Sequence, residues 1–178
     1  MSPTENRTHF ELFQFPAEYR LDTQLLDQRF RELQARIHPD TVAHLGDTEK
    51  RLALQWSTWV NEAYQTLRHP LHRARYLVGL HGIDCHLESR TAMPPEFLLE
   101  QIEWRSELQE SRALKDLERM GRLEQRLKED TTVLQASLSS LLDTHHNYSA
   151  AAEVIRQLAF LDKLEQEINQ SLAELEDE

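Results

Sequence analysis

The sequence predicts an all-α protein made of two helical units. Glycine and proline are scarce, with 4 and 6 residues in a chain of 178, and the dominant Leu, Glu, Gln, Arg and Ala favour helices. No run alternates apolar and polar residues convincingly, so no sheet is expected. Charge divides the chain, because residues 1–82 hold equal numbers of basic and acidic residues while residues 83–178 carry the whole net charge of −11.

Four helices are expected in residues 1–82. A capping box from Thr8 to Glu11 begins a short apolar helix, which Pro16 ends. The second helix runs from residue 22 or 23 to about 37, and the third from residue 47 or 48 to about 68. A fourth begins at Pro70 and stops at Gly82. The apolar faces of the second and third helices are Leu26, Phe30, Leu33 and Ile37, then Leu52, Trp56, Trp59 or Val60, Ala63 and Leu67.

Residues 83–94 have no periodicity and are expected to be a linker. Residues 95–178 then predict three helices, at about 95–111, 113–143 and 149–176. Long apolar seams on charged helices with short connections are typical of an antiparallel bundle. The two seams are Leu117, Met120, Leu123, Leu127, Leu134, Leu138 and Leu141, then Val154, Leu158, Leu161, Leu164, Ile168 and Leu175.

Composition excludes several classes of function. No apolar stretch approaches 18 residues, so no membrane span is expected, and the N-terminus has no apolar leader. Cys85 is the only cysteine, which excludes a disulfide framework and fits a reducing compartment such as the cytoplasm. The acidic second half disfavours nucleic acid as a partner, because phosphates attract basic proteins.

Metal and catalytic sites are also not expected. His69 and His72 are spaced i,i+3, but no second pair at ligand spacing and no Cys-x-x-Cys motif accompanies them. His38 and Asp40 could act as a base and its orienting partner, yet they fall on a short loop without packed surroundings. No phosphate-binding loop or nucleophile elbow is present. The sequence therefore predicts a protein that is not an enzyme and holds no cofactor.

The loop His38-Pro39-Asp40 is the strongest candidate site. Pro39 lacks a backbone donor and disfavours helical geometry at His38, so the second helix should end there. Arg29, Arg31 and Arg36 precede the loop on this helix. Such charges are usually a solvated helix face, but here one acidic partner could contact both the arginines and the loop.

A second candidate lies at the start of the bundle. Phe97, Leu98, Leu99 and Ile102 cover more than half of a helix circumference, whereas a bundle helix buries one stripe. Periodicity leaves two alternatives open: a widely packed face, or a patch that partly faces solvent and binds a partner.

These residues resemble a known family. The basic second helix, the His38-Pro39-Asp40 loop, the run NEAYQTL at residues 61–67 and the following RHP turn resemble a J-domain. The match continues with FLLEQIE at residues 97–103 and LAFLDKL at residues 158–164, which are similar to the bundle of the HscB family. This family contains J-type co-chaperones of iron–sulfur cluster assembly, and the resemblance covers nearly the whole chain in order.

The resemblance implies a two-ended adaptor. It implies a J-domain at residues 1–82, a linker at 83–94 and a scaffold-binding three-helix bundle at 95–178. The J-domain would stimulate ATP hydrolysis by the Hsp70-type chaperone HscA, and the bundle would hold the cluster scaffold IscU, so the resemblance favours the docking patch. The implied HscA-binding residues are His38, Pro39, Asp40, Arg29 and Arg36, and the implied IscU-binding residues are Leu98, Leu99, Ile102, Glu103 and Phe160.

Two departures from the family pattern bear on affinity. Thr41 stands where J-domains often carry Lys, and Ser106 stands where close relatives carry an acid. The chain also lacks the cysteine-rich module of some eukaryotic members, which fits a bacterial cytosolic protein. The alternative is a general J-protein for a DnaK-type Hsp70, but such proteins usually add Gly-rich linkers or zinc modules.

Overall fold

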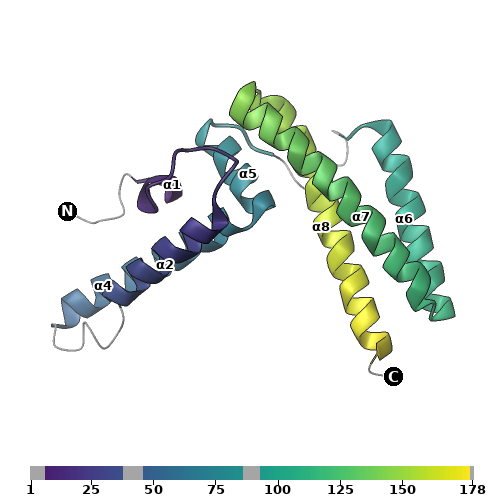
Figure 1. Cartoon of the computed structure of the whole chain (residues 1–178), viewed down its shortest axis with the longest axis horizontal. Coiled ribbons are helices and arrows are strands. Elements are labelled where there is room, and N and C mark those ends of the chain that lie inside the picture. The colour runs from purple at the N-terminus through teal and green to yellow at the C-terminus, as the bar shows by residue number, and fades with distance from the viewer. Residues whose placement is uncertain (1–6, 38–45, 86–92, 177–178) are drawn as a thin grey trace. The chain divides into compact units, whose positions relative to one another are not determined.

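The computed structural model describes residues 7–37, 46–85 and 93–176, and it confirms the all-α class (Figure 1). Across these ranges the regular structure is helical, with no strand. The contacts divide the chain into two compact units, Met1–Leu77 and Val78–Glu178. Each unit has its own apolar core.

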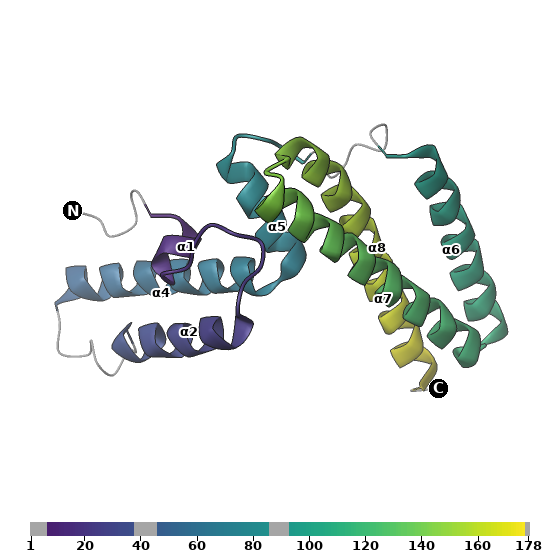
Figure 2. The same cartoon turned by 45° about the horizontal axis from the view of Figure 1, so that its top comes forward.

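The first unit is built around two long helices, α2 (Thr23–Ile37) and α4 (Asp47–Arg68), which lie side by side (Figure 1, Figure 2). The short α1 (His9–Leu12) packs on α4, and α5 (Pro70–Leu80) follows α4 directly. The predicted capping box is confirmed, because Thr8 Oγ1 accepts from Glu11 N at 3.1 Å and Glu11 Oε2 accepts from Thr8 N at 2.7 Å. The core consists of Phe10, Leu12, Phe13, Tyr19, Leu26, Val60, Ala63, Leu67, Leu71, Ala74 and Leu77.

Polar contacts fix which side of α2 faces α4. Asp27 Oδ1 accepts from the Tyr64 hydroxyl at 3.0 Å and pairs with Arg68 Nε at 3.1 Å. One turn further along, the Phe30 and Tyr64 rings stack at 3.9 Å. Because these contacts span the two helices, the residues on the other side of α2 face away from α4.

Two arginines hold the segment that connects α1 to α2. Arg29 Nη1 donates to the carbonyls of Phe13 at 2.5 Å and Gln14 at 2.9 Å, and its guanidinium lies 4.5 Å from the Phe15 ring centre. Arg73 Nε donates to the Tyr19 carbonyl at 2.7 Å. Carbonyls outside a helix need donors when they lie near a core, so these arginines replace the missing backbone partners.

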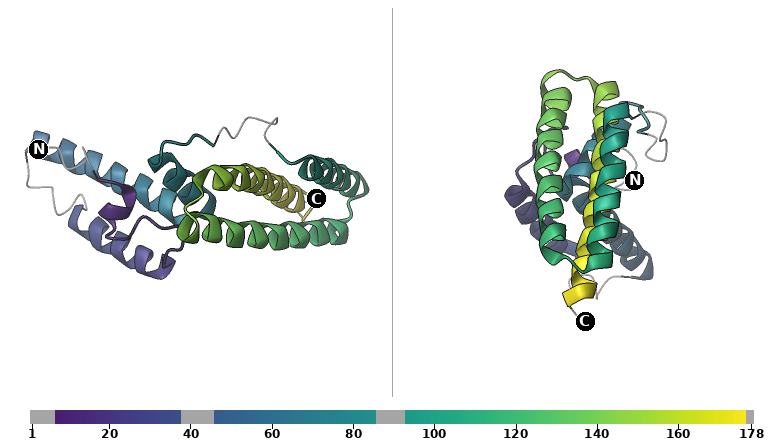
Figure 3. Two further views of the ribbon diagram at one scale, coloured as in Figure 1. Left: turned by 90° about the horizontal axis from the view of Figure 1, so that it is seen from above. Right: turned by 90° about the vertical axis from the view of Figure 1, so that its right-hand side faces the viewer.

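The second unit is an antiparallel bundle of α6 (Pro95–Leu114), α7 (Leu117–Ser139) and α8 (Tyr148–Glu176) (Figure 3). Its central core joins all three helices, with Phe97, Trp104 and Leu108 from α6, Met120, Leu123 and Leu127 from α7, and Leu161, Leu164 and Ile168 from α8. The turn between α6 and α7 lies at Lys115, whose φ of 53° is left-handed, and Asp116 caps α7 by accepting from Arg119 N at 2.9 Å. The sequence placed this break a few residues too early.

A π-helical turn, η2 (Ser140–Thr144), extends α7 and was not predicted. His145 N donates to Ser140 O at 3.0 Å, five residues back. Near this turn the buried position after Leu138 is Leu142, four residues on, not the expected Leu141. Leu117, the first residue of α7, is also more exposed than its place in the predicted seam implied.

The segment after α5 belongs to the second unit as far as it is described. Cys85 is buried, and its carbonyl accepts from Nη1 of the buried Arg156 of α8 at 3.1 Å. His81 stacks on Tyr148 at 3.6 Å. Cys85, which falls in the expected linker, therefore packs against the bundle, and residues 86–92 lie outside the described ranges.

Candidate functional site

The first candidate surface is the exposed side of α2. The loop residues His38, Pro39, Asp40 and Thr41 lie outside the described residues, and α2 is described up to Ile37. Arg36 is in the last turn of α2 and is exposed. Its charge therefore lies immediately before the predicted switch residues.

Arg29 differs from Arg36 in its surroundings. Its side chain is half-buried, because it donates to the Phe13 and Gln14 carbonyls and lies over Phe15. The family resemblance implied that Arg29 and Arg36 are both docking charges. The described contacts give Arg29 a local role in holding the segment between α1 and α2, and a basic residue in a repeating pattern does not reveal such contacts.

The second candidate surface is the N-terminal half of α6. Phe97 is buried, whereas Leu99 and Ile102 are 63% and 66% exposed. Leu98, next to Phe97, is half-buried, and Glu103 is exposed. Of the two alternatives left open by periodicity, the structure excludes the widely packed face, because two of the four apolar residues point away from the core.

Phe160 of α8 lies where this face meets the core. Its half-buried ring contacts Phe97 edge-to-face at 6.0 Å and lies nearly parallel to Trp104 at 6.2 Å. The Arg105 guanidinium lies 5.4 Å from the centre of the same ring, and Arg105 also pairs with Glu167 at 3.8 Å. Phe160 is therefore partly a core residue as well as a candidate for partner contact.

Sequence reasoning did not single out Trp104 and Arg105. Trp104 follows Phe97 by seven residues, which is two helical turns, so the spacing places both on one face. That spacing was the available signal for the inward side of α6. For Arg105 there was none, because its position over the Phe160 ring depends on how α6 packs against α8.

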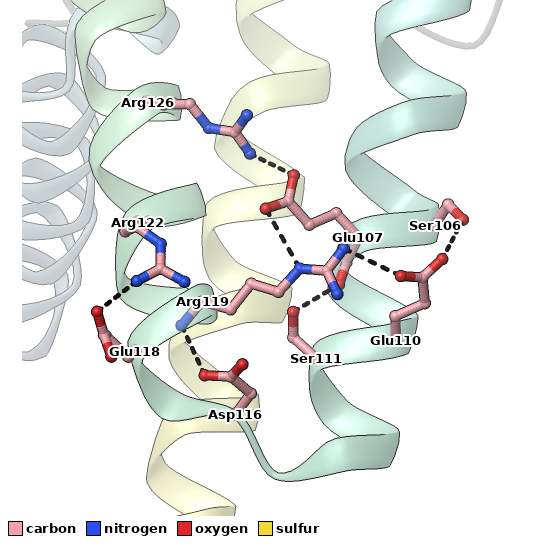
Figure 4. A network of polar contacts seen from close by, with 9 residues as sticks. All are labelled: Ser106, Glu107, Glu110, Ser111, Asp116, Glu118, Arg119, Arg122 and Arg126. Carbon is pink, nitrogen blue, oxygen red and sulfur yellow. Dashed lines mark hydrogen bonds and ion pairs between the residues drawn. The ribbon is translucent and has the colours of Figure 1, made fainter.

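A network of ion pairs joins the C-terminal half of α6 to α7 (Figure 4). Glu107 pairs with Arg126 and, at 3.7 Å, with Arg119, and Arg119 also pairs with Glu110 at 3.0 Å. Ser106, at the departure from the family pattern, donates to Glu110 at 3.4 Å. Pairs as exposed as these are worth about 0–1 kcal/mol each, so the buried Phe97, Trp104 and Leu108 determine most of the packing of α6.

The surface around Leu99 and Ile102 is acidic. Glu96, Glu100 and Glu103 are exposed on the same half of α6. An exposed apolar pair beside carboxylates is suited to a protein partner that offers apolar and basic side chains. Within the described residues no three His, Cys, Asp or Glu side chains are arranged to hold a metal ion, and no helix there is long and apolar enough to cross a membrane.

Comparisons with known proteins agree over nearly the full length of the chain. Residues 93–169 match a family model described as the HSCB C-terminal oligomerisation domain. A co-chaperone protein HscB homolog from Azoarcus sp. (strain BH72) is 44% identical over 94% of this chain and 95% of its own. A co-chaperone protein HscB homolog from Paraburkholderia xenovorans (strain LB400) is 44% identical over 96% of this chain and 97% of its own.

Solved structures give the same answer for the fold. The chaperone HscB from Vibrio cholerae superposes with a TM-score of 0.85 at 35% identity, covering 95% of this chain and 99% of its own. The crystal structure of human co-chaperone protein HscB superposes with a TM-score of 0.90 at 29% identity, covering 96% of this chain and 84% of its own. These neighbours combine a J-domain with a C-terminal helical domain. The chain therefore belongs to the HscB family, the J-type co-chaperones of iron–sulfur cluster assembly.

Proposed function

We propose that this chain is a two-ended adaptor between an HscA-type Hsp70 and the iron–sulfur scaffold IscU. The observation that carries the proposal is the outward orientation of Leu99 and Ile102 on a helix whose opposite face is packed. Exposed apolar residues beside charged ones commonly mark protein-binding sites, and family membership supplies the class of partner.

The proposed Hsp70-binding end lies in a J-domain that spans residues 1–82. His38, Pro39 and Asp40 act as the switch that stimulates ATP hydrolysis, and Arg36 supplies a docking charge next to them. Arg29 supports the same surface indirectly, because its hydrogen bonds to the Phe13 and Gln14 carbonyls attach the segment between α1 and α2 to α2. The contribution of Arg29 is then mainly to the shape of the surface.

The proposed scaffold-binding end lies in the bundle at residues 95–178, after a linker at 83–94. Leu99 and Ile102 are its apolar anchors, Leu98 and Phe160 extend the apolar area, and Glu103 lies at the polar rim. The chain itself is not an enzyme and needs no cofactor. It acts in the cytoplasm by coupling two binding events, because a co-chaperone that prefers the ATP state of its Hsp70 shifts that equilibrium.

The test is the ATPase rate of the cognate Hsp70 with the full chain, with and without the scaffold protein. The chain alone should stimulate hydrolysis, and the scaffold should raise the rate further. A matched assay with a DnaK-type Hsp70 and an unfolded polypeptide addresses the alternative of a general J-protein. Equal stimulation in that assay, with no effect of the scaffold, would overturn the proposal.

A further inference from the structure

His9 lies at the interface that attaches α1 to the rest of the first unit. Its ring stacks on Tyr76 of α5 at 4.2 Å and 7°, and it meets Trp59 of α4 edge-on at 6.4 Å. Its backbone N–H donates to the Tyr76 hydroxyl at 3.0 Å. One residue of α1 therefore makes contacts to both neighbouring helices.

The Nδ1 atom of His9 is buried and has no hydrogen-bond partner among the described residues. Buried polar atoms in folded proteins almost always have a partner. A neutral imidazole tolerates this position, because Nδ1 can carry a lone pair while the proton is on Nε2. A protonated ring carries N–H at both nitrogens, so it would place a buried donor at Nδ1 with no acceptor.

The electrostatic surroundings favour the same neutral form. Burial lowers the pKa of His9 below 6.5, and the nearby carboxylate of Glu62 on α4 opposes that shift only in part. From α5 the facing group is the Tyr76 phenol, which accepts from the His9 backbone. On α1 itself, the Glu11 carboxylate accepts from Thr8 N.

We propose that His9 makes the docking of α1 on α4 and α5 sensitive to mild acid. The neutral ring fits between Tyr76 and Trp59, and protonation weakens that fit. Since α1 carries the buried Phe10 and Leu12, its loosening opens the core of the first unit. The pKa of His9 in the folded protein lies below its pKa in the unfolded chain. The stabilisation of α1 by neutral His9 is therefore complete above about pH 6.5 and is lost as pH falls through the folded pKa.

The experiment measures hydrogen-exchange protection factors in the full chain between pH 7.5 and 5. The reporters are the amides of Phe15, which donates to Phe10 O at 2.9 Å, and Leu12, which donates to Thr8 O at 3.0 Å. Their protection factors should fall several-fold toward pH 5. The largest possible fall is about tenfold for each pH unit by which the folded pKa of His9 lies below the unfolded pKa. Protection factors correct for the intrinsic pH dependence of exchange.

Two variants separate titration of His9 from other acid effects. His9→Phe keeps a ring on Tyr76 and cannot titrate, so its protection at α1 should stay flat over this range. Glu62→Gln removes the opposing carboxylate and should move the fall to lower pH. The matched control is His81→Phe, which alters another stacked histidine in the second unit and should behave as the parent.

The proposal fails if the parent keeps its protection at pH 5, or if His9→Phe loses protection as steeply as the parent. Titration of the His9 ring signal by NMR gives an answer independent of any variant. A pKa at or above 6.5 would overturn the proposal even if His9→Phe did not fold. None of these measurements uses a partner protein, so they stand apart from the proposed adaptor function.

Discussion

At the scale of single residues, Arg29 and Arg36 carry the same charge on the same helix but lie in different surroundings. Arg29 Nη1 donates to two carbonyls and its guanidinium covers an aromatic ring, whereas Arg36 is exposed in the last turn of α2. Basic residues on an exposed helix act mainly by steering a partner. Reversing each charge therefore tests two different properties.

Arg36→Glu should weaken binding to the Hsp70 and reduce its salt dependence. Arg29→Glu should lower the free energy of unfolding by about 1–3 kcal/mol, because it leaves the Phe13 and Gln14 carbonyls without donors. Urea unfolding and Hsp70 titrations at two salt concentrations measure both effects. Arg31→Glu, also exposed on α2, is the control for the effect of charge reversal on stability. Parental stability of Arg29→Glu would contradict the structural role of Arg29.

Leu99 and Ile102 should matter for binding and not for folding. The double substitution to Ala should melt close to the parent, because both side chains are exposed, while scaffold affinity should fall by about 2 kcal/mol or more. Val133→Ala on α7, at 67% exposure, is the control for loss of an exposed apolar side chain. A lower melting temperature with full scaffold affinity would show that these residues support the fold.

Phe160→Ala should affect both properties. Its ring contacts Phe97 and Trp104 and lies under Arg105, and complete burial of a Phe side chain is worth about 3–5 kcal/mol on truncation to Ala. Since Phe160 is half-buried, the expected cost is at the low end of that range or below it. Calorimetry and scaffold titration check this, and unchanged stability would place Phe160 entirely on the surface.

At the scale of elements, local signals predicted the helices and missed the irregular turns. The Thr8–Glu11 capping box and the start of α5 at Pro70 depend on neighbouring residues, so the sequence predicted them. The left-handed Lys115 and the π-turn of η2 depend on the packing of whole helices. The same limit applies to the candidate site, where periodicity found the crowded face of α6 but not which residues point outward.

Which leucine faces the core at the end of α7 can be tested directly. Leu142→Ala should lower the free energy of unfolding by about 2–5 kcal/mol, because Leu142 is buried. Leu141→Ala should have a clearly smaller effect, since Leu141 is half-buried. Chemical unfolding of the full chain measures both. If Leu141→Ala destabilised the protein more, Leu141 and not Leu142 would face the core at this end of α7, as the predicted seam expected.

At the scale of the whole molecule, the adaptor proposal requires both surfaces on one chain. Asp40→Asn should lose stimulation of the Hsp70, while the Leu99→Ala, Ile102→Ala variant should keep basal stimulation and lose only the increment due to the scaffold. A mixture of the two variants should not restore that increment, because linkage raises the effective concentration of one partner at the other. The ATPase rate with scaffold measures this, and restoration by mixing would show two independent activities.

The Arg73 contact sets an order of events during synthesis. The Tyr19 carbonyl accepts from a side chain 54 residues later in the chain. At typical translation rates this donor emerges roughly 3–11 s after Tyr19. During that interval the nascent N-terminal segment can form the capping box of α1, but the Arg73 side chain that donates to the Tyr19 carbonyl is not yet present. The N-terminal unit therefore reaches its final structure only when the start of α5 has left the ribosome.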